Sequence, residues 1–197
     1  MTSLPQATDA RPRRVASLAA LIGAGLLLQA GDGDPAEVSG DIPAAGPVTQ
    51  VTAELARMDG DRDVADTWIG SLPEAVFDAL DYRPVVDADG FPANPDGRCS
   101  SPVPLPERFE PPCRTHDLGY DLLRVAHEEG EALPQELRPA LDRQLGNRIS
   151  TSCPVGIVAG AGCRGLGAVV DVVVGVNTWR QGNGAPVAED LPWPTPG

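Results

Sequence analysis

The residues best suited to chemistry stand together between Cys113 and Tyr120, a segment that reads Cys-Arg-Thr-His-Asp-Leu-Gly-Tyr. It holds one of only two histidines in the chain. On an α-helix His116 and Tyr120 would share a face because they are four residues apart, whereas Asp117 would point about 100° away from His116. One helical turn would therefore present a general base to one space and an anionic metal ligand to an adjacent space, since histidine titrates near neutral pH.

Ester hydrolysis is one reaction that a histidine base with neighbouring carboxylates could carry out. It needs an activated nucleophile and a group that stabilises the developing oxyanion. The sequence contains no G-x-S-x-G nucleophile elbow, so a serine hydrolase would lack its main signature. Direct attack by a water molecule is the alternative, with His116 as the general base. Asp142, on the next predicted helix, would accept the second ring N–H of His116 and stabilise the imidazolium as it forms.

The pattern C-x-x-H-D-x-x-Y resembles the active-site helix of secreted phospholipases A2. The local sequence Thr-His-Asp-Leu-Gly-Tyr is most similar to the small bacterial and fungal (prokaryotic-type) branch of that family. The resemblance covers residues 48–182 in order, including all four cysteines. Cys99 precedes the motif, Asp142 stands eleven residues before Cys153, and Cys163 is expected to open a last helix.

The resemblance implies a calcium-dependent phospholipase A2. Such an enzyme releases the fatty acid from the sn-2 position of a glycerophospholipid at a membrane or micelle interface. The family's catalytic pair maps onto His116 and Asp142, and Tyr120 maps onto a structural support. Calcium takes oxygen ligands, and the resemblance assigns these to the carboxylates of Asp117 and Asp96 and to the carbonyl of Gly97. The bound ion would orient the phosphodiester and act as a Lewis acid.

The sequence departs from the family pattern in the loop before the first cysteine. The family aspartate usually stands two residues before that cysteine, whereas Asp96 stands three before Cys99, and the extra residue is the cation Arg98. This departure favours an alternative, a non-catalytic relative that keeps the scaffold as a calcium- or lipid-binding or toxin-like secreted protein.

The four cysteines allow two disulfides, and the sequence alone leaves three connectivities open. The resemblance implies the pairs Cys99–Cys113 and Cys153–Cys163. Each bridge would add about 2–4 kcal/mol by restricting the unfolded chain.

Composition limits the partners. The formal net charge is −13, and all 15 basic residues are arginines. Such an acidic chain is not expected to bind nucleic acid or to be attracted strongly to anionic lipid. We expect a monomer that binds a phospholipid surface.

The N-terminus has the layout of a secretory signal peptide. Arg11, Arg13 and Arg14 precede an apolar run from Val15 to Leu28, and a membrane span needs about 20 apolar residues. We therefore predict four regions: a signal peptide (1–30), a flexible linker (31–47), the phospholipase A2-like domain (48–182) and a Pro-rich tail (183–197). Secretion is the expected destination, and a protein anchored by the uncleaved segment is the alternative.

Hydrophobic periodicity predicts an all-α domain, and the resemblance implies that two long helices in it are antiparallel. The expected helices cover residues 48–58, 64–70, 71–80, 115–129, 135–151 and 165–180. Ser71 and Glu74 have the spacing of a capping box, and Thr115 is the expected N-cap of the motif helix. The segment from Pro84 to Pro112, which holds eight prolines, is expected to be an irregular loop without strands.

Periodicity also suggests how the acyl chain would be held. The hypothesis places it in a channel walled by Phe77, Leu80, Leu123 and the helix over Val169–Val176.

Other motifs are weaker. Residues 160–165 match G-x-G-x-x-G, but no strand–helix–strand unit surrounds them. Asp59, Asp61 and Asp63 open like an EF-hand loop that then lacks the required glycine and glutamate. The cysteines lack the close pairs of a zinc site.

Overall fold

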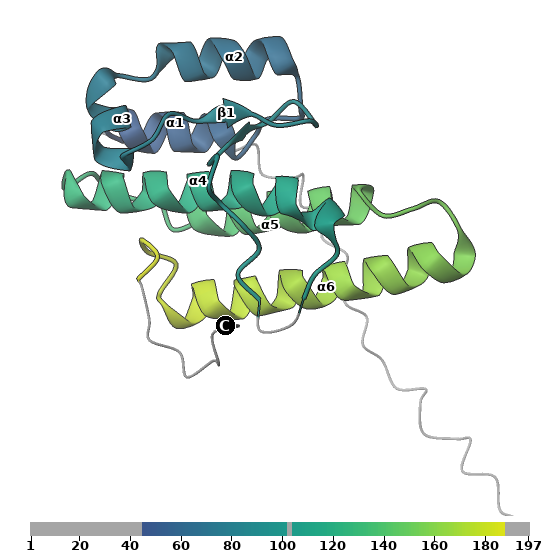
Figure 1. The fold of residues 1–197 in the computed structure, drawn as a ribbon. Helices are drawn as coiled ribbons and strands as arrows, with labels where there is room; N and C mark the ends of the chain where they lie inside the picture. Colours follow the sequence, from purple (N-terminus) through teal and green to yellow (C-terminus); the bar gives the residue numbers. More distant parts are fainter. Residues whose placement is uncertain (1–44, 102–103, 188–197) are drawn as a thin grey trace, which may run out of the picture. The chain divides into compact units, whose positions relative to one another are not determined.

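The computed structural model describes residues 45–101 and 104–187 (Figure 1). They belong to one unit, residues 42–197. The predicted signal peptide, nearly all of the predicted linker and most of the predicted tail lie outside the described residues.

The described part of the chain is mostly helical and carries two disulfides, which confirms the predicted all-α class. Its elements are α1 (Pro47–Leu55), α2 (Arg62–Ser71), α3 (Glu74–Leu80), β1 (Val85–Val86), β2 (Pro92–Ala93), the 3-10 helix η1 (Glu107–Phe109), α4 (Glu110–Glu128), α5 (Leu137–Thr151) and α6 (Ile157–Arg180).

The predicted capping box at the start of α3 is wrong. Ser71 is the last residue of α2, and its hydroxyl donates to the carbonyl oxygen of Trp68 at 2.7 Å. Helix α3 begins at Glu74 after Pro73, without a side-chain cap. The side chain that does cap a helix here is Asp61, which accepts the backbone N–H groups of Asp63 and Val64 at the start of α2.

The segment from Pro84 to Pro112 was expected to lack strands, but it contains a short antiparallel hairpin of β1 and β2. The turn is organised by Asp87, whose Oδ1 accepts the backbone N–H groups of Asp89 and Phe91, each at 2.9 Å. Hydrogen bonds from an aspartate side chain to nearby backbone N–H groups stabilise a turn. The hairpin can therefore form without strands in which polar and apolar residues alternate.

The motif helix α4 begins at Glu110, so the prediction that Thr115 caps it is wrong. Prolines suit the first turn of a helix because their missing N–H has no partner there anyway, and Pro111 and Pro112 fill that turn. Thr115 lies buried inside the helix, where its hydroxyl accepts a hydrogen bond from Arg148 of α5 at 2.5 Å.

Helices α4 and α5 run antiparallel. Thr115 is joined to Arg148, while Gly119, one turn later on α4, packs against Leu141, two turns earlier on α5. A Cβ atom at Gly119 would lie 2.6 Å from Leu141 Cδ2, so a residue without a side chain is needed for this close approach.

Helix α6 packs along α5 and begins eight residues before its predicted start, at Ile157. Cys163 therefore lies inside the helix. The disulfides join Cys99 to Cys113 and Cys153 to Cys163, the pairs that the resemblance implied.

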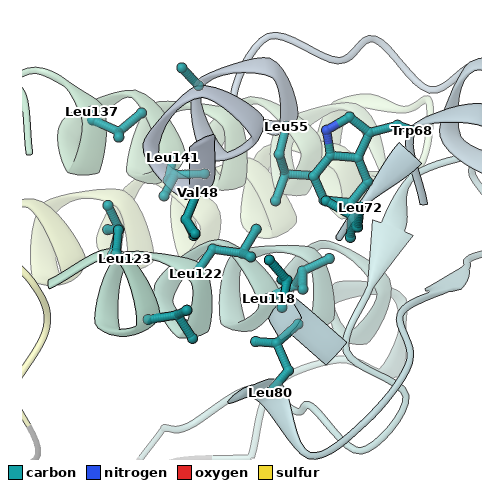
Figure 2. Packing of buried hydrophobic residues seen from close by; sticks show 14 of the residues in the cluster. Val48, Leu55, Trp68, Leu72, Leu80, Leu118, Leu122, Leu123, Leu137 and Leu141 are labelled. Atoms are coloured by element: carbon teal, nitrogen blue, oxygen red, sulfur yellow. The ribbon is translucent and has the colours of Figure 1, made fainter. Parts of the chain in front are cut away.

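The main core lies where α4 and α5 meet α1, α2 and α3. Figure 2 shows Leu118 and Leu122 of α4 packed with Leu141 of α5 and with Val48 and Leu55 of α1. A second cluster around Phe109, Leu145 and Ile149 packs against the inner face of α6. The first cluster includes Leu118 and Leu122 of α4, and the second includes Cys113 near the start of the same helix.

Candidate active site

Helix α4 presents its motif residues on two faces, as the spacing predicted. On the first face, Nε2 of His116 lies 2.8 Å from Oδ1 of Asp142 on α5, and both residues are buried, at 8% and 4% exposure. An ionised carboxylate can only accept. Nε2 therefore carries the proton, and Nδ1 is left as the basic nitrogen.

Tyr120 supports this pair. Its hydroxyl donates to the same Oδ1 of Asp142 at 2.8 Å, and its ring lies 4.0 Å from the His116 ring, centroid to centroid. Thr178 of α6 lies 3.1 Å from the Tyr120 hydroxyl and must donate to it, because the tyrosine proton is used on Asp142. Tyr120 was expected to be a structural support, and in the structure its hydroxyl holds the Asp142 carboxylate.

The environment keeps Asp142 ionised. Burial alone would raise the pKa of Asp142, but the hydrogen bonds from His116 and Tyr120 outweigh burial and lower that pKa below its usual range. Burial, with the nearby charge of Asp142, raises the pKa of Tyr120 to about 12, so the phenol stays a neutral donor. The pair can thus hold one imidazole tautomer and stabilise its protonated form.

Arg138 is a further residue near the pair that sequence reasoning missed. It is 1% exposed, its guanidinium carbon lies 4.8 Å from the centroid of the Tyr120 ring, and its Nη1 donates to Gln181 Oε1 and to the Gly184 carbonyl. Its position four residues before Asp142 was the available signal, because residues at that spacing share a helix face. Thr178 could not be identified in this way, because no motif or spacing in α6 distinguishes it from its neighbours.

On the second face, Asp117 meets the loop that precedes Cys99. Its Oδ2 accepts the backbone N–H of Arg98 at 2.9 Å. A Cβ atom at Gly97 would lie 2.9 Å from that same oxygen, so the loop can approach the carboxylate this closely only with glycine at this position. Asp96, the residue before Gly97 in the loop, is exposed.

Several bonds fix this loop to α4. Asn94 donates its backbone N–H to the Arg114 carbonyl at 3.1 Å and its side-chain amide to Asp121 Oδ2 at 3.0 Å. Arg114 Nε donates to the Gly97 carbonyl at 3.1 Å. The Cys99–Cys113 disulfide closes the same junction. The loop is therefore held against the helix by contacts of its own, and one carbonyl assigned to calcium is engaged by an arginine.

Asp117 is a carboxylate that could serve as one ligand of a hard cation. Burial raises the pKa of Asp117, although the Arg98 N–H opposes this, so a positive charge beside the carboxylate would offset part of the cost of burying it. Because Gly97 has no side chain, the backbone of the loop can lie close to the Asp117 carboxylate. Within the described residues, no three His, Cys, Asp or Glu side chains cluster as a metal site would require. A cation at Asp117 would therefore depend on backbone carbonyls and water for its other ligands.

The predicted acyl channel is wrong. Val76, Phe77, Leu80 and Leu123 belong to the main core, which packs α3 against α4. Along residues 169–176, the outward valines are exposed, and only Val170 and Val174 turn inward, onto the second cluster. Periodicity identified apolar faces but could not distinguish a packed core or an open surface from a channel wall.

Two surface hollows are present elsewhere. One, of about 480 Å³, lies between Met58, Phe91 and the Gln144–Arg148 side of α5. The other, of about 710 Å³, lies between the end of α1 and α2. Neither is lined by His116 or Asp142.

Comparison of the chain with protein-family models, with curated proteins and with solved structures found no match. Any functional conclusion therefore depends on the site itself. The site offers a base whose tautomer is fixed, a buried carboxylate partner, and a second carboxylate on the adjacent helix face against a glycine loop.

Proposed function

We propose that the protein is a calcium-dependent phospholipase A2 that hydrolyses the sn-2 ester of glycerophospholipids by water attack. The observation that carries the proposal is the 2.8 Å contact between His116 Nε2 and Asp142 Oδ1, formed one residue away from a carboxylate that faces the Gly97 loop. Base, orienting carboxylate and cation ligand are the components that this reaction requires.

In this reaction His116 removes a proton from the attacking water through Nδ1. The negative charge of Asp142 stabilises the imidazolium that forms, and the proton then passes to the leaving alkoxide of the lysophospholipid. Tyr120 and Thr178 keep the Asp142 carboxylate in place throughout. Asp117, with the carbonyl of Gly97 and with Asp96 beside it, would hold calcium. When bound, calcium supplies Lewis-acid stabilisation of the oxyanion and a grip on the phosphate.

The wider proposal follows from the same residues. We infer a phospholipase A2-like helical domain, exported through a signal peptide over residues 1–30 and acting outside the cell. The two disulfides support that destination, because such bridges persist in oxidising compartments.

A second candidate is a non-catalytic relative that binds lipid or calcium. Two observations favour it. Arg114 Nε and the Arg98 N–H engage the Gly97 carbonyl and the Asp117 carboxylate, which are assigned to the cation. His116 is also only 8% exposed, so a substrate must open a path to it.

A phospholipid hydrolysis assay distinguishes the two candidates. The purified mature protein is incubated with a phospholipid labelled in its sn-2 chain, in calcium or in a calcium chelator. We expect labelled fatty acid to be released in calcium, and we expect release to fall to background in chelator and in Asp117→Asn. Absence of release under all conditions, from protein shown to be folded, would favour the non-catalytic relative.

A further inference from the structure

Helix α6 leaves one long face uncovered. Val158, Val169, Val172, Val173, Val176 and Trp179 are between 55% and 87% exposed. Most of the exposed large apolar side chains of the described residues lie on this helix or in the turn before it. Soluble proteins rarely expose a contiguous apolar patch of this kind without a partner for it.

These side chains form one strip. At about 100° per residue they fall within an arc of roughly 120°, and the strip from residue 158 to residue 179 is about 31 Å long. The positions between them on the same face are alanines and glycines. Arg164 lies outside this arc, the side chain of Asp171 lies against Gly146 of α5, and Arg180 ends the helix. The opposite side of α6 packs on α5 through Leu166, Val170 and Val174.

We propose that this strip, the outer face of α6, seats the protein on a zwitterionic phospholipid surface, with the helix lying in the plane of the interface. Trp179 at one end, with Arg180 beside it, has the composition found where a helix meets the boundary between acyl chains and headgroups. The net charge of −13 opposes adsorption to anionic lipid, so apolar burial must supply the attraction.

The composition of the strip argues against a protein partner. The anchors of protein interfaces are mainly tryptophan, tyrosine and arginine, and valine is under-represented among them. Here five of the six large side chains of the strip are valines.

A spanning helix is the other alternative. Helix α6 is long and apolar enough to cross a membrane, with a mean hydropathy of 1.5 over an 18-residue window within residues 158–180. However, it is joined to the end of α5 by the Cys153–Cys163 disulfide, and Thr178 on its inner face reaches the hydroxyl of Tyr120. Spanning would separate these contacts, whereas lying in the interface preserves them.

The position of α6 also connects the lipid surface to the proposed reaction. Thr178, buried on the inner face, belongs to the hydrogen-bond network of Asp142, and the next residue is the exposed Trp179. As a means of supplying substrate, the strip rests on the proposed function. Binding to lipid can be measured without hydrolysis.

The test uses the mature protein carrying His116→Gln, so that lipid is not consumed, and phosphatidylcholine vesicles in a sedimentation assay. The variant Val172→Asp/Val176→Asp places two charges in the strip. Val64→Asp, at a valine on α2 that is 52% exposed, is the matched control. We expect at least a tenfold loss of vesicle binding in the double variant, no loss in the control, and little change between low and high salt. Fluorescence of Trp179 should shift to the blue on binding, and Trp179→Phe should remove that shift.

Three results would overturn the proposal. One is vesicle binding by the double variant equal to that of the control. Another is a dimer in lipid-free solution that the double variant converts to monomer, because the strip would then be covered by a second copy. The third is resistance of the bound protein to alkaline carbonate extraction, which would indicate a spanning helix. Binding without hydrolysis by the unmodified protein would leave the strip assignment intact and reject the proposed function alone.

Discussion

At the scale of residues, the site depends on how a single carboxylate oxygen is shared. Oδ1 of Asp142 accepts from both His116 and Tyr120, each at 2.8 Å. These bonds more than offset the cost of burying the charge, because hydrogen bonds to ionised groups are among the strongest in proteins. The same bonds fix the imidazole with Nε2 protonated and leave Nδ1 as the only basic nitrogen.

The lowered pKa of Asp142 predicts how stability depends on pH. A carboxyl group whose pKa is lower in the folded protein stabilises it above the unfolded pKa, about 3.9 for aspartate, and this contribution is lost as pH falls through the folded pKa. We therefore expect Asp142→Asn to unfold at a lower urea concentration than the unmodified protein at pH 7. The difference should shrink as pH falls from 5 to 2. A difference that is constant with pH would show that the ionisation of Asp142 contributes nothing.

Arg114 is expected to weaken calcium binding, because its Nε occupies the Gly97 carbonyl. Arg114→Met should free that oxygen and raise calcium affinity several-fold, measured by isothermal titration calorimetry. Arg124→Met is the matched control, since Arg124 is also on α4 and pairs with Asp121 without touching Gly97. Equal gains in both variants would show that only the loss of positive charge matters and that the carbonyl is not a ligand.

At the scale of elements, the separation of α4 and α5 sets the distance between His116 and Asp142. Gly119 makes that separation small, because a Cβ atom there would lie 2.6 Å from Leu141, which is 1% exposed. The close approach of α4 and α5 at this point therefore depends on Gly119, which lies on the motif helix.

Gly119→Ala is expected to cost about 1–3 kcal/mol of unfolding free energy, since it overpacks a closed core. It should also reduce hydrolysis by moving α5 away from His116. Gly165→Ala is the control, because a Cβ atom at Gly165 of α6 meets nothing within 4 Å, and replacing an exposed helical glycine should stabilise by about 0.5–1 kcal/mol. Chemical denaturation and the sn-2 assay check both, and a neutral Gly119→Ala would contradict the spacing role.

The elements show how far the sequence leads. The i, i+4 spacing of His116 and Tyr120 was enough to place both residues on one helix face, and the resemblance described above supplied Asp142 as the partner of His116. Boundaries were less predictable. Helix α4 starts earlier than expected because Pro111 and Pro112 fit its first turn, and the hairpin after α3 depends on the side chain of Asp87 and not on any alternation of residues.

The finer contacts of the site could not be predicted because they depend on tertiary packing. Arg138 and Thr178 reach Tyr120 only once α5 and α6 are placed against α4. Likewise, the resemblance implied Asp96 and Gly97 as cation ligands, but it could not show that Arg114 engages the Gly97 carbonyl or that the Arg98 amide engages Asp117.

At the scale of the whole molecule, the His116–Asp142 pair lies between the main core and α6, a helix whose outer face is exposed. Helices α1 and α3 pack on α4, and α6 packs on α5 and exposes its own valine strip. The acidic charge of the chain is then compatible with a lipid substrate if contact is made through apolar side chains, which salt does not screen.

The most direct test of the central claim is release of the sn-2 fatty acid by His116→Gln in calcium, compared with the unmodified protein. Circular dichroism and the thermal midpoint would show that the variant is folded. Glutamine has no basic nitrogen, so we expect release to fall at least about a hundredfold, the scale of general base catalysis, with little change in the midpoint. Release at the rate of the unmodified protein would contradict the assignment of His116 as the base, and with it the proposed mechanism.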